Sequence, residues 1–169
     1  MYDAALFYSK LSDEKSSILD QLELTSGEFV VSTIHRASNT DDEASLTAIV
    51  ALLNRVHEEI PVILPLHPRT KAYIEKYGLN LKVHCIDPIG YFDMVQLIKG
   101  AKYVLTDSGG VVREAYFFEK PSIILLEKPL WPELVWEGVC ISAKPELSEL
   151  LLAFEKMKQA NPDYSKKIY

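Results

Sequence analysis

Short apolar segments alternate with helical segments along almost the whole chain, and this alternation limits the possible folds more than any other feature. Six segments are rich in apolar and β-branched residues and have the length of strands, at 28–34, 61–66, 82–86, 103–106, 122–126 and 139–141. Strands that are apolar on both faces must be covered on both faces, and parallel strands need long crossover connections such as helices. The sequence therefore predicts an α/β fold: a three-layer α/β/α, doubly wound parallel sheet of the Rossmann-like type.

The helical segments are marked by end signals as well as by apolar spacing. Residues 3–10 and 12–22 are predicted as two short helices, with Ser12 as the N-cap of the second. A capping-box pattern at 40–43 begins a long amphipathic helix, and Gly78 ends the helix that follows the second strand. Further helices are expected at 91–99, 111–118, 133–137 and 145–159, the last with a proline in its first turn.

Composition excludes several classes of protein. With 169 residues, 48% of them hydrophobic and 25% charged, the chain has the profile of one soluble globular domain. No apolar run approaches the roughly 20 residues of a membrane helix, and the first residues carry no signal pattern, so we expect a cytoplasmic protein with no membrane partner. A net charge of −6 argues against nucleic acid as a partner.

The two cysteines are expected to be buried free thiols. Cys85 and Cys140 lie in apolar contexts of predicted strands and have no C-x-x-C spacing. The sequence therefore predicts neither a disulfide nor a zinc site. No metal and no cofactor is predicted.

The segment 103–118 predicts an anion site. The strand at 103–106 ends before Ser108, Gly109 and Gly110, and a helix is expected to begin after the two glycines. Backbone N–H groups at the N-terminus of a helix, together with the helix dipole, favour phosphate. Glu114 follows one turn into the helix, where its carboxylate could accept hydrogen bonds from the hydroxyls of a ribose. The spacing matches neither G-x-G-x-x-G nor the P-loop.

These residues resemble the non-hydrolysing UDP-N-acetylglucosamine 2-epimerases. The resemblance rests on Thr-Asp-Ser-Gly-Gly at 106–110, Glu-Ala at 114–115, Lys-Pro at 120–121, His-Arg at 35–36 and Pro-Glu at 132–133, and it extends over nearly the whole chain. It corresponds to the second half of the family's two-domain, GT-B-type enzyme. Residues 1–24 are then a helical segment leading in from an absent first domain, 25–160 a UDP-binding Rossmann-like domain, and 161–169 a tail that stops before the return to the first domain.

The resemblance implies epimerisation at C2, interconverting UDP-GlcNAc and UDP-ManNAc through elimination and re-addition of UDP, in cell-surface polysaccharide biosynthesis. The acid and base carboxylates of the family lie in the first domain, so the isolated chain is expected to be inactive, and the full-length parent to be a homodimer. His35 is implied as a catalytic residue that also binds UDP. The other implied UDP-binding residues are Arg36, Ser108, Gly109, Gly110 and Glu114.

Four further residues are weaker candidates for substrate contact: His67, Arg69, Met94 and Glu133. Met94 stands where some relatives place an aromatic ring against uracil, although its spacing with Tyr91 and Phe92 favours packing in the core. Ser38 stands where the family has glutamate, and Asp41 or Glu43 could substitute for that carboxylate. Arg113 replaces an acidic residue and is interpreted as structural, on a solvated helix face.

Two other functions stay open from the residues. The chain could be the nucleotide-binding half of a GT-B glycosyltransferase, which shares the fold and often a ribose-binding glutamate. It could also be a non-catalytic module that binds a nucleotide sugar without turning it over. The His-Arg and Thr-Asp-Ser-Gly-Gly motifs favour the epimerase.

Overall fold

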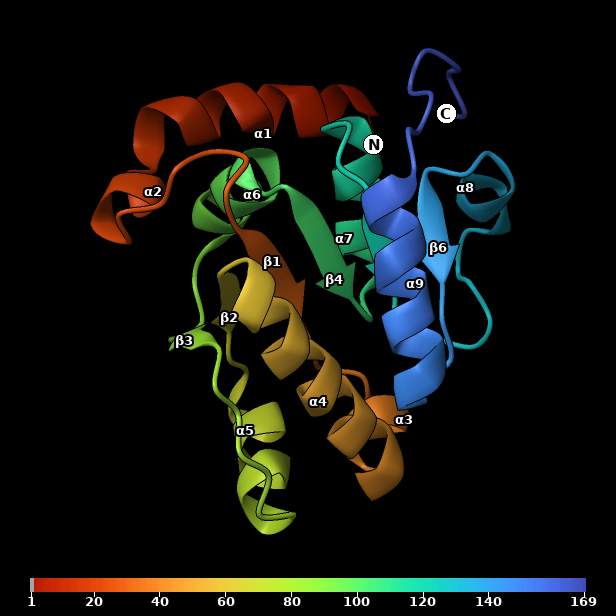
Figure 1. Cartoon of the computed structure of the whole chain (residues 1–169). Coiled ribbons are helices and arrows are strands. Elements are labelled where there is room, and N and C mark those ends of the chain that lie inside the picture. The colour runs from red at the N-terminus through yellow and green to blue at the C-terminus, as the bar shows by residue number, and fades with distance from the viewer. Residues whose placement is uncertain (1) are drawn as a thin grey trace.

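The computed structural model describes residues 2–169 and contains one six-stranded sheet in which every strand pair is parallel (Figure 1). The strand order is β3-β2-β1-β4-β5-β6. The predicted α/β fold class is confirmed, and the ends of the predicted strands differ from the observed ones by at most two residues. The strands are β1 (Val30–Thr33), β2 (Val62–Pro65), β3 (His84–Ile86), β4 (Tyr103–Thr106), β5 (Ser122–Ile124) and β6 (Cys140–Ser142).

Helices cover both faces of the sheet. The elements α4, α5 and α9 pack with strand residues such as Leu64 and Leu105 in one buried cluster, whereas α6 and α7 pack with Val31 and Val104 in another. The long helix α1 lies against α6 on the outside of the second layer (Figure 1). The helices are α1 (Tyr2–Lys15), α2 (Ile18–Gln21), α3 (Ala37–Thr40), α4 (Glu43–Glu59), α5 (Pro68–Lys76), α6 (Tyr91–Gly100), α7 (Gly109–Phe117), α8 (Pro132–Trp136) and α9 (Leu147–Gln159).

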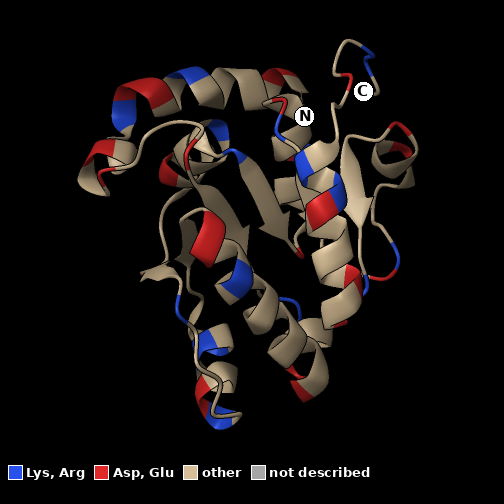
Figure 2. Ribbon diagram, viewed as in Figure 1, with Lys and Arg blue, Asp and Glu red and all other residues tan. Residues whose placement is uncertain are grey.

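Charged residues lie outside the strands of this three-layer arrangement. None of the six strands contains Lys, Arg, Asp or Glu, and Figure 2 shows the charged residues on helices and loops. Burying a charge without a partner costs several kcal/mol, so an uncharged sheet is what a covered sheet requires. No helix within residues 2–169 is both long and apolar enough to cross a membrane.

The first helices differ from the prediction because a serine has a distant partner. Ser12 is not an N-cap: it lies inside the single helix α1, is fully buried, and its hydroxyl donates to the carbonyl oxygen of Phe92 at 2.7 Å. The capping box is also misplaced, since the N-cap of α4 is Asp42, whose carboxylate accepts from Ser45 N–H at 2.9 Å. Pro145 precedes α9 rather than standing in its first turn.

The cysteines differ from each other in exposure. Cys140 is a buried free thiol, as predicted, and burial raises the pKa of its thiol. Cys85 is free but exposed, so the prediction that it is buried was wrong. Its strand, β3, is the edge of the sheet and pairs only with β2, which leaves one side of that strand uncovered.

The reversal of strand order positions the functional residues. The chain runs from β1 outwards to β3 and then returns to β4 on the other side of β1, so β1 and β4 are the strands at the switch point. Their register pairs Thr33 with Thr106 at the carboxyl ends of both strands. The residues that follow, His35 and Asp107, therefore emerge next to each other at the edge where doubly wound sheets bind ligands.

Candidate functional site

A buried carboxylate holds the loop after β1 to the end of β4. Asp107 has no solvent exposure and accepts hydrogen bonds from the backbone N–H groups of His35, at 3.1 Å, and Arg36, at 2.9 Å. The buried amide of Asn39 donates to the same carboxylate at 3.2 Å. A carboxylate that accepts several N–H groups fixes their direction strongly, because such bonds are charge-assisted. Asp107 thus fixes the backbone at positions 35 and 36.

The same aspartate also orients two side chains. His35 Nδ1 lies 3.5 Å from Asp107 Oδ1, and about half of the imidazole is exposed. The guanidinium Nε of Arg36 donates to the Asp107 carbonyl oxygen at 2.7 Å. A partner at one ring nitrogen leaves the other nitrogen for a ligand. Because Asp107 lies beside Nδ1, Nε2 is the nitrogen of His35 that is available to a ligand.

The N-terminus of α7 supplies unpaired N–H donors beside this loop. Ser108 is the N-cap, and its hydroxyl accepts from Val111 N–H at 3.4 Å. Both glycines lie inside the helix as its first two residues, so the prediction that they precede it was wrong. Within residues 2–169, the N–H groups of Gly109 and Gly110 have no acceptor. Together with the helix dipole, these N–H groups are suited to binding an anion.

The two glycines differ in their surroundings. A Cβ at Gly109 would lie 2.7 Å from Leu130 Cδ1 and 3.2 Å from Trp131 Nε1, and the Trp131 indole donates to the Gly109 carbonyl oxygen at 2.9 Å. At Gly110 the nearest atom to such a Cβ is Ser108 Oγ at 3.8 Å. Glycine at 109 is therefore required by the loop that packs on it, whereas position 110 opens to solvent.

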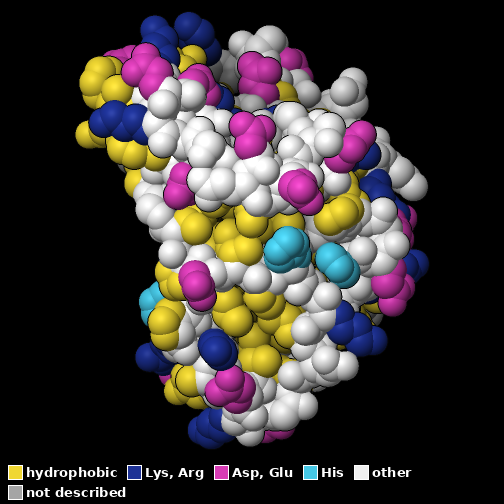
Figure 3. Space-filling model, turned by 90° about the vertical axis from the view of Figure 1, so that its left-hand side faces the viewer, with side chains coloured by type: hydrophobic (Ala, Val, Ile, Leu, Met, Phe, Trp, Pro, Cys, Tyr) yellow, Lys and Arg dark blue, Asp and Glu magenta, His cyan; other side chains and the backbone are white. Residues whose placement is uncertain are grey.

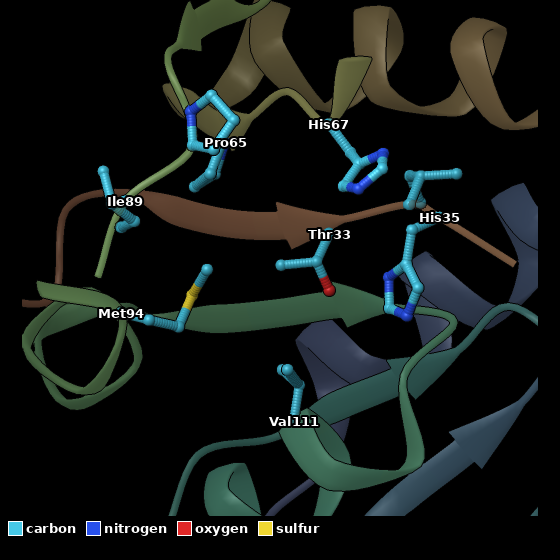
Figure 4. A pocket seen from close by; sticks show the side chains of 9 residues that line it. Thr33, His35, Pro65, His67, Ile89, Met94 and Val111 are labelled. Carbon is cyan, nitrogen blue, oxygen red and sulfur yellow. The ribbon is translucent and has the colours of Figure 1, made fainter. Parts of the chain in front are cut away.

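An apolar pocket of about 220 Å³ adjoins the His35 loop. Its lining comes from the ends of β1 and β2, the loop before α6, and the first turns of α6 and α7: Thr33, Ile34, His35, Pro65, His67, Pro88, Ile89, Met94 and Val111. Figure 3 shows histidine side chains at the rim of an apolar hollow on this face. In Figure 4, Met94 and Ile89 lie at one end of the pocket and His35 at the other. Such a pocket suits a flat, largely apolar group such as a nucleobase.

Met94 and its neighbours differ from the core packing that their spacing favours. Met94 is half-buried and lines the pocket, although it also packs against the α6 and α7 cluster. Tyr91 is 45% exposed, so a core role for it was wrong. Its hydroxyl instead lies 2.8 Å from Glu114 Oε1, to which it donates. Burial raises the pKa of the Glu114 carboxyl, and the tyrosine hydrogen bond opposes that shift.

The candidate residues after β2, His67 and Arg69, form hydrogen bonds with other residues of the chain. The Nδ1 of His67 accepts from Arg69 N–H at 3.2 Å, so the side chain caps α5 while it lines the pocket. Arg69 Nη2 donates to both carboxylate oxygens of Asp41, at 2.6 and 2.7 Å, and this ion pair is exposed. Arg69 does not line the pocket. Ser38, in the position where glutamate was expected, is exposed.

Arg113 and Glu133 both contact Tyr169. The Arg113 guanidinium is stacked between the rings of Trp131 and Tyr169, 4.5 Å from each centroid, rather than on a solvated face. Its structural role agrees with this contact. The Glu133 carboxylate accepts from the Tyr169 hydroxyl, which lowers the pKa of the Glu133 carboxyl. The structure thus brings His35, Arg36, Ser108 and the glycines together, with Glu114 one helical turn away, whereas Glu133 contacts Tyr169 and does not line the pocket.

Sequence reasoning missed three residues that shape the site. Asp107 lay within a named motif and Tyr91 within a predicted helix, but neither was assigned to the site, and Asn39 was not assigned to it either. An acidic residue directly after a buried strand is a signal that could have identified Asp107, because such a side chain must find donors at the strand end. The partners of Asn39 and Tyr91 are far apart in sequence, and no local pattern indicates them.

Comparison with known proteins places the chain in a family. The family described as UDP-N-acetylglucosamine 2-epimerase matches residues 1–169. A UDP-2,3-diacetamido-2,3-dideoxy-D-glucuronate 2-epimerase of Pseudomonas aeruginosa is 45% identical over 139 residues, which cover 82% of this chain and 38% of that protein. A UDP-N-acetylglucosamine 2-epimerase homolog of Methanococcus maripaludis is 38% identical, covering 98% of this chain and 48% of its own length.

A solved structure agrees with both matches. The UDP-GlcNAc 2-epimerase of Methanocaldococcus jannaschii, in complex with UDP-GlcNAc and UDP, superposes with a TM-score of 0.86 at 30% identity, covering 96% of this chain and 47% of that one. The chain thus spans half or less of the length of these relatives and corresponds to one half of a GT-B-like epimerase structure. It belongs to the UDP-N-acetylglucosamine 2-epimerase family.

Proposed function

We propose that this chain is the UDP-binding half of a UDP-sugar 2-epimerase. The observation that carries the proposal is the pair of free N–H groups at the N-terminus of α7, beside His35 and the apolar pocket, with Glu114 one turn further along the helix. In this arrangement the amides of Gly109 and Gly110 and the Ser108 hydroxyl bind the diphosphate. Glu114 accepts hydrogen bonds from the ribose hydroxyls, and the uracil ring enters the pocket against Met94.

The reaction follows from what these donors do to a leaving group. Elimination of UDP from the sugar transfers negative charge to the diphosphate, and N–H groups already aimed at that position stabilise the charge without reorganising. His35, through Nε2, and Arg36 add donors on the β1 side, and both are fixed there by Asp107. Proton removal from C2 and its return need carboxylates, which we assign to a first domain outside this chain. Without those carboxylates, the chain alone binds UDP weakly and does not epimerise. We also propose that the full-length parent is a homodimer.

Two sugars are candidates for the substrate. UDP-GlcNAc, interconverted with UDP-ManNAc, is the substrate that the family description and the Methanocaldococcus structure support. A diacetamido glucuronate is favoured by the 45% identity to the Pseudomonas aeruginosa protein. Competition between UDP-GlcNAc and UDP-2,3-diacetamido-2,3-dideoxyglucuronate for this chain, followed by NMR, distinguishes them. Tighter binding of the uronate would exclude UDP-GlcNAc as the preferred ligand.

The proposal is tested by calorimetry with UDP, CDP and 2′-deoxy-UDP on the chain and on Glu114→Gln. A hydrogen bond from a hydroxyl to a carboxylate contributes about 1.5–3 kcal/mol at most, so Glu114→Gln should weaken UDP binding about tenfold and reduce the penalty for the deoxy analogue. Glu155→Gln, an exposed carboxylate of α9, is the matched control and should bind like the unaltered chain. Equal UDP affinity and equal discrimination in Glu114→Gln would show that the ribose is bound elsewhere.

A further inference from the structure

Tyr91 and Glu114 form a side-chain contact that joins two helices at the edge of the site. Tyr91 is the first residue of α6, and Glu114 lies in the middle of α7. The tyrosine hydroxyl lies 2.8 Å from Glu114 Oε1 and donates to it. Because a carboxylate has two oxygens and about four acceptor sites, this bond occupies one of them and leaves Oε2 free. The contact therefore fixes the carboxylate without blocking it.

The tyrosine ring is itself fixed from the outer layer of helices. The Tyr8 ring of α1 packs edge-on against the Tyr91 ring, with centroids 5.6 Å apart and planes at 87°. The Phe92 ring lies 6.2 Å from Tyr91 and 6.4 Å from Tyr8, so the three rings contact one another. Edge-to-face pairs at these distances are favourable, so the hydroxyl is held in one direction although Tyr91 is 45% exposed. A chain of contacts thus runs from α1 through Tyr91 to Glu114.

Electrostatics give this contact a second effect. Burial raises the pKa of the Glu114 carboxyl, and the Tyr91 hydrogen bond lowers it, so the bond favours the ionised form of a carboxyl that its surroundings disfavour. Burial and Glu114 raise the pKa of Tyr91 to about 12, which keeps its hydroxyl a donor at neutral pH. Among residues 2–169, the titratable side chains facing Glu114 are Tyr91 from α6 and, behind it, Tyr8 from α1.

We propose that Tyr91 is a positioning residue for nucleotide binding, because its hydroxyl fixes the Glu114 carboxylate in one orientation, where the ribose hydroxyls bind. The inference rests on the proposed function, in which Glu114 binds ribose. It adds that the first turn of α6 and the ring of Tyr8 determine how well the Glu114 carboxylate binds the ribose. Tyr91 itself need not contact the nucleotide.

The test separates the positioning of Glu114 from the binding of UDP. Tyr91→Phe keeps the ring against Tyr8 and Phe92 and removes only the hydroxyl. In chains labelled with ¹³C at the glutamate carboxyl carbons, the Glu114 signal is identified by its absence in Glu114→Gln. Its pKa is then measured without ligand, and it should be higher in Tyr91→Phe than in the unaltered chain. UDP affinity, measured by NMR titration at pH 7, should fall about three- to tenfold.

A matched control and the pH profile make the result specific. Tyr103→Phe removes a hydroxyl at the amino end of β4, remote from the site, and should change neither the Glu114 pKa nor the UDP affinity. As pH falls, Tyr91→Phe should lose UDP binding at a higher pH than the unaltered chain. A structural role alone would lower affinity equally at every pH, and thermal melts of the variants exclude loss of the fold.

The possible failures are distinguishable. If the unaltered chain binds no UDP, the proposed function fails and the role of Tyr91 in nucleotide binding fails with it. If the chain binds UDP and discriminates against 2′-deoxy-UDP, but Tyr91→Phe leaves the Glu114 pKa and that discrimination unchanged, only the role of Tyr91 is overturned. A raised Glu114 pKa together with weaker, less discriminating UDP binding supports the proposal.

Discussion

Removing the Asp107 carboxylate should cost more stability than removing any exposed carboxylate of the chain. In Asp107→Ala three donors lose an acceptor: the N–H groups of His35 and Arg36 and the side-chain amide of Asn39. A buried polar group that loses its hydrogen-bond partner costs about 1–3 kcal/mol. Because water can reach His35, we use the lower limit of this range. At the lower limit, three groups at about 1 kcal/mol each give a loss of about 3 kcal/mol. Small domains have only about 5–15 kcal/mol of stability, so this loss is large.

Urea unfolding followed by circular dichroism at 222 nm measures that loss. Asp42→Ala is the control, because Asp42 is an exposed carboxylate that accepts a single N–H, from Ser45 at 2.9 Å, at the N-cap of α4. Loss of such a cap costs about 1 kcal/mol. If the slope with urea is unchanged in both variants, the midpoints compare their stabilities directly. An Asp107→Ala chain that is destabilised no more than Asp42→Ala would refute the idea that Asp107 holds the loop after β1 to β4.

Two further predictions concern α7. Gly109→Ala should lower the urea midpoint, since its Cβ would lie 2.7 Å from Leu130 Cδ1. Gly110→Ala should raise stability by about 0.5–1 kcal/mol, because its Cβ would meet only Ser108 Oγ at an ordinary contact distance of 3.8 Å. Equal effects would contradict the proposed packing. Burial raises the folded-state pKa of the Glu114 carboxyl, so the chain should lose stability as pH rises from the unfolded value of 4.5 through the folded one. Glu114→Gln cannot ionise and should be more stable than the parent at pH 7 but not at pH 4, as urea midpoints at both pH values would show.

The sheet could be predicted because its signal is local and repeated. Each strand is an uncharged apolar run bounded by residues that end strands, and each run was found as a strand within two residues of its expected position. Two of the errors occurred where a residue has a partner far away in the sequence. Ser12 looked like an N-cap because its bond to Phe92, 80 positions away, leaves no trace in its neighbourhood. Gly109 looked like a turn residue. The position requires glycine because Leu130, which is distant in sequence, leaves no room for a Cβ there.

The site was partly predictable for the same reason. His35, Ser108 and Glu114 follow strand ends or a helix start, and such positions can be identified from the sequence. The contact that fixes Glu114 comes from Tyr91, on another helix, so only the packing of α6 against α7 reveals it. Likewise, Arg69 was a candidate for substrate contact because of the family resemblance, but its carboxylate partner is Asp41, 28 positions away.

The order of the strands explains why Asp107 has so many partners. Sequence places His35 after β1 and Asp107 after β4, but only the strand order puts β4 directly beside β1, with Thr33 opposite Thr106. The carboxylate therefore bonds the backbone after β1 and stands one residue before Ser108, the N-cap of α7. A displacement of either element would break charge-assisted bonds in a fully buried place, which is costly. It follows that His35 and the free amides of α7 keep a fixed separation in this half, so the donors to which we assign the diphosphate are already aligned.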